Sequence, residues 1–598
     1  MKTIGFVNDI RRKDAKQIVT VVLNYEELED NKLVLGEFIV VKSGAARKFL
    51  ARVEDCYYAP VIISGDEANS ALATGHMNST MDESAAKRIN FLHYDLALLG
   101  EISQEDGKFF AGVREVPSLL DVEVYRPNQK ELQQIADAKV PGGNGPVEPF
   151  RLGVLQYGTR EAADGSPALP PFQVNIHFNI ANLQAKRTAV FGKTGYGKSN
   201  LIKTLITLSH KVSEEAKQKT AQLVFDVNGE YAFSNKQGDG LLDVFRKAGQ
   251  TANIVVYTNR RDAQQQYGGE VVKPVKFDVI ENPELAVSLV TGKRRQRNAS
   301  EAGYLENLAD PDMHETVRAF WRCFAVKEIG IAPASFHKAQ YLAPVKYKKD
   351  KGLDEGTKHY VDDFDEAYDA ICAYSSSETT KNLKGRSGQF SFLKRMHCFT
   401  GNEGSSSANT VDFFKSLKED VAEGKIVIVD LPSLDSKLLA PLMDKIGSEL
   451  FAKAQDNFLI GSVDPNATAQ GMADVLMYVE EAHNVLSDEQ NTIFPRIARE
   501  GRKYGIGMVY STQRPGSINE DILTQSENFF VMHVGSEEDA MRLRRAKVAF
   551  ASPITDFILT EPAVGVAFVY SEPYQPYVLS CKVRKFEDVL SSVDPSAT

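Results

Sequence analysis

The sequence has little cysteine and no long apolar run. Its five cysteines are odd in number, widely scattered and never arranged as Cys-x-x-Cys, which argues against a disulfide framework and against a zinc cluster. No stretch approaches the ~18 to 20 apolar residues of a membrane span. The first residues also have no apolar core of the signal-peptide kind. These absences predict a soluble cytoplasmic protein with no membrane partner.

An excess of positive charge is also lacking. Seventy Lys and Arg residues stand against eighty Asp and Glu residues, a formal net charge of −10, so any DNA contact requires a local basic patch. The runs 293–297 and 346–351 are candidates for such a patch, although a charge run is more often a solvated loop. With 598 residues, 43% of them hydrophobic, the chain is long enough for two to four folded domains.

The chain divides into regions of different pattern. Short alternating runs in residues 1–138 predict a small β-barrel or sheet. The breaker-rich stretch at 140–149 predicts a linker, which we place at 139–150. Longer helical periodicity at 281–420 predicts a helical insertion, so that one α/β domain would consist of residues 151–280 and 421–598.

The α/β interpretation rests on short apolar runs separated by helical stretches. Such runs are typical of strands buried on both faces, so they predict a mostly parallel sheet. The predicted strands are 188–191, 222–226, 425–430, 475–479, 507–511 and 529–534, and a helix is predicted at 198–210.

The first of these strands leads into a phosphate-binding motif. Gly192-Lys-Thr-Gly-Tyr-Gly-Lys-Ser199 matches G-x-x-x-x-G-K-[ST] and lies between a predicted strand and a predicted helix. Its glycines would turn backbone N–H groups toward phosphate oxygens, Lys198 would reach the β- and γ-phosphates, and the Ser199 hydroxyl would complete a Mg²⁺ shell. A glycine-rich βα turn without a ligand is the weaker alternative, because both flanking elements are of the right type.

The strand at 475–479 ends in two carboxylates, Glu480 and Glu481. One carboxylate at a strand tip can hold the Mg²⁺ shell through water while its neighbour polarises the attacking water. A solvated acidic turn is the alternative, and pairing with the phosphate loop makes it less favoured. His483 has no second ligand at metal-binding spacing, so a hydrogen-bonding or coupling role is preferred to a metal site.

Two further groups of polar residues have open roles. Asp226 and Glu230 follow another strand, where they would lie at the edge of a site, but Asp226 could equally form or cap a turn. The basic segment around Arg499 and Arg502 suits an arginine finger or a solvated helix face with Arg–Glu pairs. Gln513, with the preceding threonine at the next strand tip, could sense a γ-phosphate.

These stretches together resemble the HerA family of P-loop motor ATPases, relatives of the FtsK translocases. The resemblance rests on GKTGYGKS at 192–199, DVNGEY at 226–231, VEEAHN at 479–484 and REGRKYGIGMVYSTQRP at 499–515, and it spans most of residues 150–580. Residues 1–138 are similar to the small N-terminal barrel (HAS-barrel) that these proteins share with rotary ATP synthases. The Val-Asn after Asp226 departs from the Pro or His that relatives often carry there.

The resemblance implies a RecA-like core, interrupted by a helical insertion and assembled as a homohexamer that passes double-stranded DNA through its pore. It implies ATP and Mg²⁺ as cofactors, with Glu481 as the catalytic carboxylate, Arg499 or Arg502 as a finger presented to a neighbouring subunit, and Ser199 and Glu480 on the metal side. The implied catalytic set is Lys198, Glu480, Glu481, Arg499, Arg502 and Gln513. The implied nucleotide-binding set is Gly192, Lys193, Thr194, Gly195, Tyr196, Gly197, Lys198, Ser199, Asn200, Asp226 and Glu230.

The resemblance also implies a separate effector protein, since HerA-type motors work with nucleases or, in anti-phage complexes, with a nuclease or a sirtuin-like NADase. Two functions remain open at this point. The first is an ATP-driven DNA translocase or helicase, and the second is an assembly ATPase that scaffolds and gates an effector without processive DNA movement. Both need the same ATP site, so the motifs do not separate them.

Overall fold

The computed structural model describes most of the chain. The described residues are 3–13, 16–23, 32–44, 47–59, 91–103, 109–113, 117, 122–137, 151–156, 172–216, 219–236, 238–286, 288, 315–331, 339–374, 385, 388, 390–397, 412–434, 438–463, 473–487, 492–560, 562–572 and 575–590. They form two compact units, unit 1 with residues 1–218, 481–490 and 507–598, and unit 2 with residues 219–480 and 491–506. The predicted linker at 139–150 and the basic run at 293–297 lie outside the described residues.

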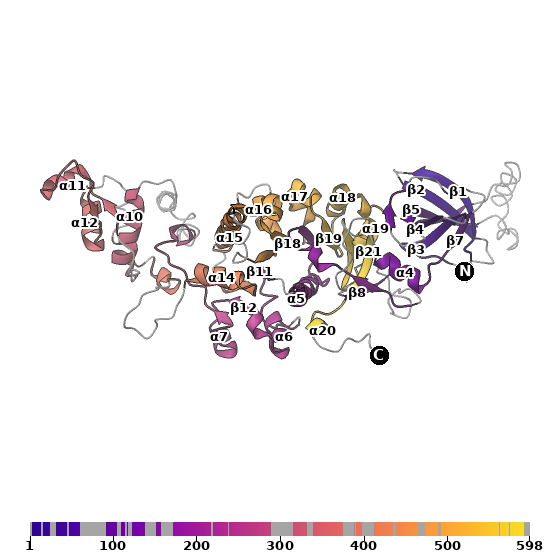
Figure 1. Ribbon diagram of the computed structural model, residues 1–598, viewed down its shortest axis with the longest axis horizontal. Helices are drawn as coiled ribbons and strands as arrows, with labels where there is room; N and C mark the ends of the chain where they lie inside the picture. The colour runs from indigo at the N-terminus through magenta and orange to yellow at the C-terminus, as the bar shows by residue number, and fades with distance from the viewer. Residues whose placement is uncertain are drawn as a thin grey trace, which may run out of the picture. The chain divides into compact units, whose positions relative to one another are not determined.

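The amino-terminal part of unit 1 is an antiparallel sheet of seven strands (Figure 1). Its strands are β1 (Phe6–Lys13), β2 (Lys16–Leu23), β3 (Phe38–Ser43), β4 (Arg47–Ala59), β5 (Phe91–Ile102), β6 (Phe109–Ala111) and β7 (Val122–Tyr125). They pair in the order β1-β2-β5-β4-β3-β7, with β6 on β5, around a core of Val, Ile, Leu and Phe side chains. The expected short strands are confirmed. Closure into a barrel stays a prediction, although the Ile4 N–H donates to the Val124 carbonyl (2.7 Å) and so connects the segment before β1 with β7.

The rest of unit 1 is built around β10. Its strands pair in the order β18-β10-β19-β20-β21-β8-β9, and β10 is parallel to both of its neighbours. The strands are β8 (Arg151–Leu155), β9 (Asn175–His177), β10 (Arg187–Phe191), β18 (Ile506–Thr512), β19 (Asn528–Val531), β20 (Val566–Ser571) and β21 (Gln575–Val583). The helices are α4 (Gln129–Ala136), α5 (Lys198–Ala216), α17 (Glu520–Thr524), α18 (Glu537–Ala546), α19 (Ile554–Thr560) and α20 (Glu587–Leu590).

Unit 2 contains a parallel sheet in the order β13-β12-β16-β11-β17. Its strands are β11 (Thr220–Asp226), β12 (Ile254–Tyr257), β13 (Val272–Lys273), β16 (Ile426–Asp430) and β17 (Asp474–Val479). The accompanying helices are α6 (Leu241–Lys247), α7 (Arg261–Tyr267), α14 (Phe413–Ala422), α15 (Leu439–Val463) and α16 (Phe494–Glu500). Across both units, no helix in the described ranges combines the length and the apolar character needed to cross a membrane.

The region predicted as a helical insertion contains helices in unit 2. They are α10 (Glu315–Phe324), α11 (Val345–Asp350) and α12 (Phe364–Tyr374), accompanied by the two short strands β14 (Tyr341–Leu342) and β15 (Tyr360–Val361). Helices α10 and α12 are held together by stacking of Phe320 on Tyr368, with ring centroids 6.2 Å apart. In the basic run at 346–351, Lys348 is buried and donates to the carbonyls of Glu355 and Thr357, so this lysine serves the local fold.

The predicted strands of the α/β region are confirmed, because β11, β16 and β18 are buried along their whole length, as the continuous apolar runs required. The predicted strand at 529–534 is shorter, since β19 ends at Val531. The sheet of unit 1 is parallel only around β10. The pairings β19–β20, β20–β21, β21–β8 and β8–β9 are antiparallel, an extension that the sequence patterns did not indicate.

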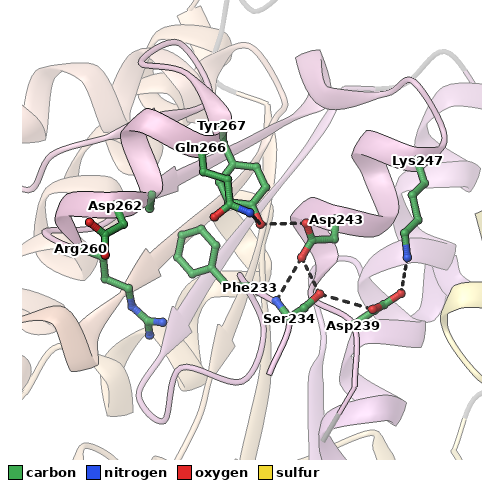
Figure 2. Close-up of a pocket in the computed structure, with 10 residues that line it drawn as sticks. Phe233, Ser234, Asp239, Asp243, Lys247, Arg260, Asp262, Gln266 and Tyr267 are labelled. Carbon is green, nitrogen blue, oxygen red and sulfur yellow. Dashed lines mark hydrogen bonds and ion pairs between the residues drawn. The ribbon is translucent and has the colours of Figure 1, made fainter. Parts of the chain in front are cut away.

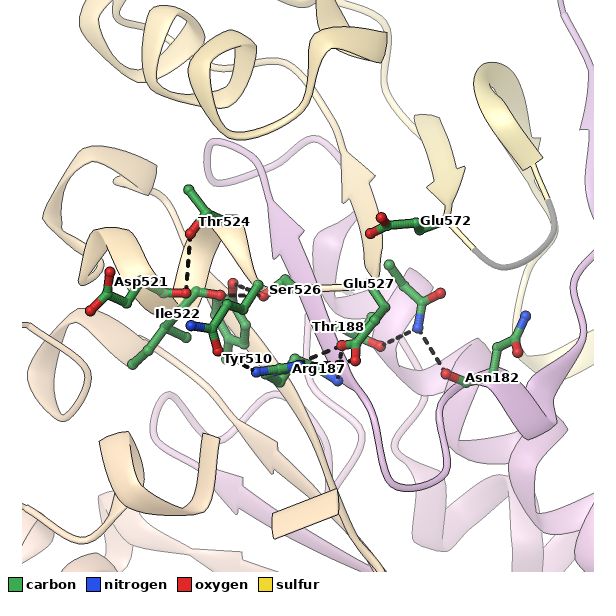
Figure 3. A network of polar contacts seen from close by, with 12 residues as sticks. Asn182, Arg187, Thr188, Tyr510, Asp521, Ile522, Thr524, Ser526, Glu527 and Glu572 are labelled. Atoms are coloured by element: carbon green, nitrogen blue, oxygen red, sulfur yellow. Dashed lines mark hydrogen bonds and ion pairs between the residues drawn. The ribbon is translucent and has the colours of Figure 1, made fainter. Parts of the chain in front are cut away.

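A buried polar network joins the strands of unit 1 at the start of β10 (Figure 3). The Asn528 side chain donates to the Asn182 carbonyl (2.8 Å) and to Thr188 Oγ1 (3.0 Å), and it accepts a hydrogen bond from Ser571 Oγ (2.7 Å). Beside it, Arg187 forms a two-pronged ion pair with Glu527. Because buried polar groups must be paired, this network fixes the register of β10, β19 and β20.

Asn528→Ala tests this network. The substitution removes three hydrogen bonds between buried groups, a loss of roughly 2 to 4 kcal/mol when each costs about 1 kcal/mol or more. We expect a lower urea midpoint for the unfolding transition, followed by circular dichroism. Thr524→Ala, at an exposed position of α17, is the control and should shift the midpoint little. Equal midpoints for the two variants would contradict a structural role for the network.

Candidate functional site

The loop between β10 and α5 carries the phosphate-binding motif. Gly195 and Gly197 have φ values of +88° and +100°, which L side chains rarely adopt. A Cβ on Gly197 would also lie 3.2 Å from the Cα of Gly565. Both glycines are therefore required by the path of the loop, which brings the chain from the strand directly to the first turn of the helix.

This path leaves backbone donors available. Within the described part of the chain, the N–H groups of Thr194 to Gly197 donate no backbone hydrogen bond, and α5 begins immediately afterwards at Lys198. Free N–H groups at a helix N-terminus, with its positive dipole end, form an anion site. Lys198, the first residue of α5, is buried and is thus largely shielded from bulk water. The loop therefore fits a chain of phosphate groups.

Neighbouring residues hold the loop in place. The Lys193 N–H donates to the His533 carbonyl (2.9 Å), and the Tyr196 ring lies on the His533 ring with centroids 4.7 Å apart. The Asn200 side chain donates to the Arg584 carbonyl and accepts from the Phe586 N–H. The expectation that Asn200 binds nucleotide is therefore not supported for its side chain, which instead anchors the carboxy-terminal segment to α5.

Glu481 and Gln513 come together with the phosphate loop in unit 1. Gln513, directly after β18, donates from Nε2 to Glu481 Oε1 (3.0 Å) and accepts at Oε1 from Thr194 Oγ1 (2.8 Å). His483 Nδ1 lies 3.4 Å from Glu481 Oε2 and 3.3 Å from Thr512 Oγ1. A carboxylate, an amide and an imidazole thus stand beside the loop, as a water-activating group and its supports would.

Glu480 directly precedes Glu481 in the sequence but belongs to unit 2, and its environment differs from that of Glu481. It is buried and accepts hydrogen bonds from the Val227 and Asn228 N–H groups and from Asn228 Nδ2, at 3.1 to 3.2 Å. Burial, reinforced by the charge of Asp226, raises the pKa of Glu480 to about 8. The adjacent carboxylates therefore have separate surroundings, and the two different roles predicted for them stay predictions.

Asp226 has the turn-forming role that the sequence left as one of two alternatives. Its two oxygens accept the backbone N–H groups of Glu230, Tyr231 and Ala232 at 2.9 to 3.3 Å, which closes the turn after β11. Burial raises the pKa of Asp226 to about 6 in spite of these three donors. Glu230 contributes its N–H group to the same turn and is partly exposed.

An ion pair at the end of β16, the strand beside β11, was not predicted from the sequence. Asp430, the last residue of β16, is fully buried and is paired with Arg260 at 2.8 Å, and it also accepts from Thr258 Oγ1 at 2.6 Å. The Arg260 guanidinium lies over the Phe233 ring, 5.2 Å from its centroid. The position of Asp430 could have indicated this role, because Asp430 ends a predicted parallel strand just as Asp226 does.

The basic segment is α16 followed by a 3₁₀ turn, Gly501–Tyr504. Arg496 pairs with Glu500 at 3.2 Å, which is the Arg–Glu contact of a solvated helix face. Arg499 and Arg502 are exposed. The Tyr504 ring is packed edge-on against Phe451 and Phe458 of α15, with centroids 5.4 and 5.5 Å away. This packing holds the segment that carries both arginines, and it is compatible with either predicted role.

Unit 2 also contains a cavity of about 520 Å³ between α6, α7 and the preceding loop (Figure 2). Asp243 accepts from Tyr267 Oη and from Ser234, and Lys247 pairs with Asp239. These polar groups satisfy one another. None of the residues predicted for the nucleotide site lines this cavity, so we assign it no part in that site.

Comparisons with known proteins agree with this geometry. Residues 168–446 match the family described as "Helicase HerA, central domain". The chain is similar to proteins named DNA double-strand break repair helicase HerA from Sulfurisphaera tokodaii (25% identical over 227 residues), Sulfolobus acidocaldarius (29% over 181) and Saccharolobus solfataricus (28% over 194). The matched regions cover 37%, 29% and 31% of this chain and 43%, 34% and 37% of those relatives, less than half of their own length in each case.

The raised pKa of Glu480 predicts a pH-dependent stability. Its folded-state pKa of about 8 lies above its ordinary value of 4.5, so between these pH values the folded chain retains a proton that the unfolded chain has lost. Stability from this group is therefore present below about pH 4.5 and decreases as the pH rises toward about 8. Glu480→Gln removes the effect.

We expect the thermal unfolding midpoint of the Glu480→Gln variant to exceed that of the wild type by a margin that grows from pH 5 to pH 8. Nucleotide-free protein is heated in buffers of matched ionic strength. Glu270→Gln, at an exposed position, is the control and should show no such trend. A margin that stays constant or shrinks as the pH rises would contradict the buried, protonated state of Glu480.

Proposed function

We propose that this chain, whose residues 168–446 match the central domain of the HerA family, is an ATP-hydrolysing motor that translocates or unwinds double-stranded DNA. The observation that carries the proposal is the phosphate loop of unit 1, with its available N–H groups, its buried Lys198 and the Glu481 carboxylate linked to it through Gln513. A phosphate cradle alone would bind nucleotide. A carboxylate tied to the cradle supplies the group that hydrolysis requires.

Each residue has a role in this proposal. Lys198 neutralises charge on the β- and γ-phosphates, and Glu481 accepts a proton from the attacking water. Mg²⁺ bound with the nucleotide would draw electron density from the phosphates, with the Ser199 hydroxyl on its protein side. No group of three or more His, Cys, Asp or Glu residues in the described ranges could hold a metal by itself, so the remaining ligands would be phosphate oxygens and water.

The ring is a further part of the proposal. In a homohexamer, Arg499 or Arg502 would stabilise charge on the γ-phosphate held by a neighbouring subunit. Both side chains are exposed, and the packing of Tyr504 on α15 gives the segment a defined conformation, which supports presentation of an arginine to a second subunit. DNA would then pass through the pore of a cytoplasmic complex.

A separate effector completes the proposal. The expected partner is a nuclease or a sirtuin-like NADase acting in DNA processing or in anti-phage defence. The alternative, an assembly ATPase that gates such an effector without moving DNA, uses the same phosphate loop and the same Glu481. DNA-dependent movement is therefore the property that decides between the two.

The test is ATP turnover with and without linear duplex DNA, combined with displacement of a protein roadblock from the duplex. A motor should hydrolyse ATP faster on DNA and displace the roadblock from one direction. Lys198→Ala should abolish both activities, because the charge on the β- and γ-phosphates is lost while the helix tolerates alanine. Turnover stimulated only by the effector would favour the assembly ATPase, and wild-type turnover in folded Lys198→Ala protein would contradict the phosphate-loop assignment.

A mixing experiment tests catalysis across subunits. Removal of a finger typically costs ~10³- to 10⁵-fold in turnover, so Arg499→Ala/Arg502→Ala protein should be nearly inactive while it still binds ATP. Mixed with Lys198→Ala subunits, it should regain part of the activity, because some interfaces then join an intact phosphate loop to an intact finger. ATPase activity is measured against mixing ratio. No recovery in rings shown to be mixed would assign the arginines to the helix surface.

A further inference from the structure

The backbone at Glu481 is unusual for a residue with a side chain. Its φ and ψ are +46° and +48°, in the left-handed region that costs free energy for any residue with a Cβ. The conformation directs the carboxylate, and it persists only where surrounding contacts hold it. The contacts on that carboxylate are therefore informative about its function.

Two side chains hold the carboxylate, one on each oxygen. Gln513 Nε2 donates to Oε1 at 3.0 Å, and His483 Nδ1 lies 3.4 Å from Oε2. A carboxylate only accepts hydrogen bonds, so the His483 contact favours the imidazole form that carries a proton on Nδ1. Thr512 Oγ1, 3.3 Å from the same Nδ1 and buried at the end of β18, keeps the ring from turning away.

The same arrangement reaches the phosphate loop. The Gln513 amide uses its other end, Oε1, to accept a hydrogen bond of 2.8 Å from Thr194 Oγ1. Thr194 thus fixes the amide plane, and the amide plane fixes which oxygen of Glu481 receives its N–H group. The loop that would bind phosphate and the carboxylate that would activate water are connected through a single side chain.

We propose that His483 and Thr194 are positioning residues, which hold the Glu481 carboxylate in register with the phosphate loop, His483 directly and Thr194 through Gln513. The inference rests on the proposed function, since it takes Glu481 as the group that activates water. A misplacement of about 1 Å at a reacting group can cost ~10²-fold in rate. Loss of either positioning residue should therefore lower kcat by about 10- to 100-fold and leave ATP affinity within about threefold.

The His483 experiment compares three variants. Asn places an amide nitrogen one bond from Cγ, where His has Nδ1, whereas Gln places its amide nitrogen one bond further out. We expect His483→Ala to lose kcat, His483→Asn to recover most of that loss, and His483→Gln to resemble Ala. ATPase kinetics give kcat and KM, and a fluorescent ATP analogue gives the affinity. Equal kcat in the Asn and Gln variants, or wild-type kcat in Ala, would overturn the role of His483.

The Thr194 experiment uses Thr194→Val, which keeps the shape and removes the hydroxyl, and Thr194→Ser, which keeps the hydroxyl. Thr194 is exposed, so neither variant should affect folding. We expect Val to lower kcat without weakening binding of the fluorescent analogue, and Ser to retain most of the turnover. Weaker binding with unchanged kcat would instead make Thr194 a direct phosphate contact and overturn the positioning role.

Glu481→Gln separates the inference from the function on which it rests. If this variant binds ATP but hydrolyses it slowly, Glu481 is the water-activating group, and the His483 and Thr194 variants then decide the inference alone. If Glu481→Gln has wild-type turnover, the proposed catalytic role is wrong and the positioning role falls with it. Wild-type kcat in His483→Ala and Thr194→Val, with Glu481→Gln inactive, would overturn only the inference.

Discussion

The organisation of unit 1 depends on a short stretch of backbone whose N–H groups have no backbone acceptor. Unpaired N–H groups are costly when buried, so residues 194–197, whose N–H groups donate no backbone hydrogen bond, must lie at the surface or against a ligand. The residues around it satisfy this requirement. Gly195 and Gly197 allow the turn, and the contacts of Lys193 and Tyr196 with His533 hold it in place. The outcome is a loop whose conformation is held by neighbouring residues while its N–H groups stay available.

Unit 2 is dominated by the opposite problem, acidic groups in an apolar interior. Asp226 and Asp430 end the parallel strands β11 and β16, and Glu480 follows directly after the neighbouring strand β17. Each is compensated differently. Asp226 accepts hydrogen bonds from three backbone N–H groups, and Asp430 forms an ion pair with the Arg260 guanidinium. Glu480 accepts three hydrogen bonds, and burial raises its pKa to about 8. These partners matter for stability, because removing one of them would leave a buried charge unpaired. That loss costs more free energy than a surface ion pair contributes.

The two adjacent carboxylates illustrate how a site can assign different chemistry to the same residue type. Burial favours the neutral form of Glu480 by raising its pKa, whereas Glu481 is turned by its left-handed backbone toward an amide and an imidazole. On a regular strand, consecutive side chains point to opposite faces. The change of backbone conformation at Glu481 is thus what gives each carboxylate its own environment.

Much of the fold could be read from the chain itself. Strands buried on both faces give continuous apolar runs, so β10, β11, β16, β17 and β18 were predictable. The antiparallel strands β20, β21, β8 and β9 were not, because pairing direction depends on connections rather than on local pattern. The phosphate loop and the Glu480–Glu481 pair could also be identified from the sequence, because each consists of neighbouring residues in the chain.

What the sequence determined by itself is the set of local elements and the chemistry that consecutive residues can support. Only the tertiary structure decided which side chains meet across long separations. It paired Arg260 with Asp430, 170 positions apart, and it joined the Asn200 side chain to the carboxy-terminal segment. It also joined Thr194, Gln513, Glu481 and His483. Such contacts depend on how strands and loops pack in three dimensions, and no local pattern of residues encodes them.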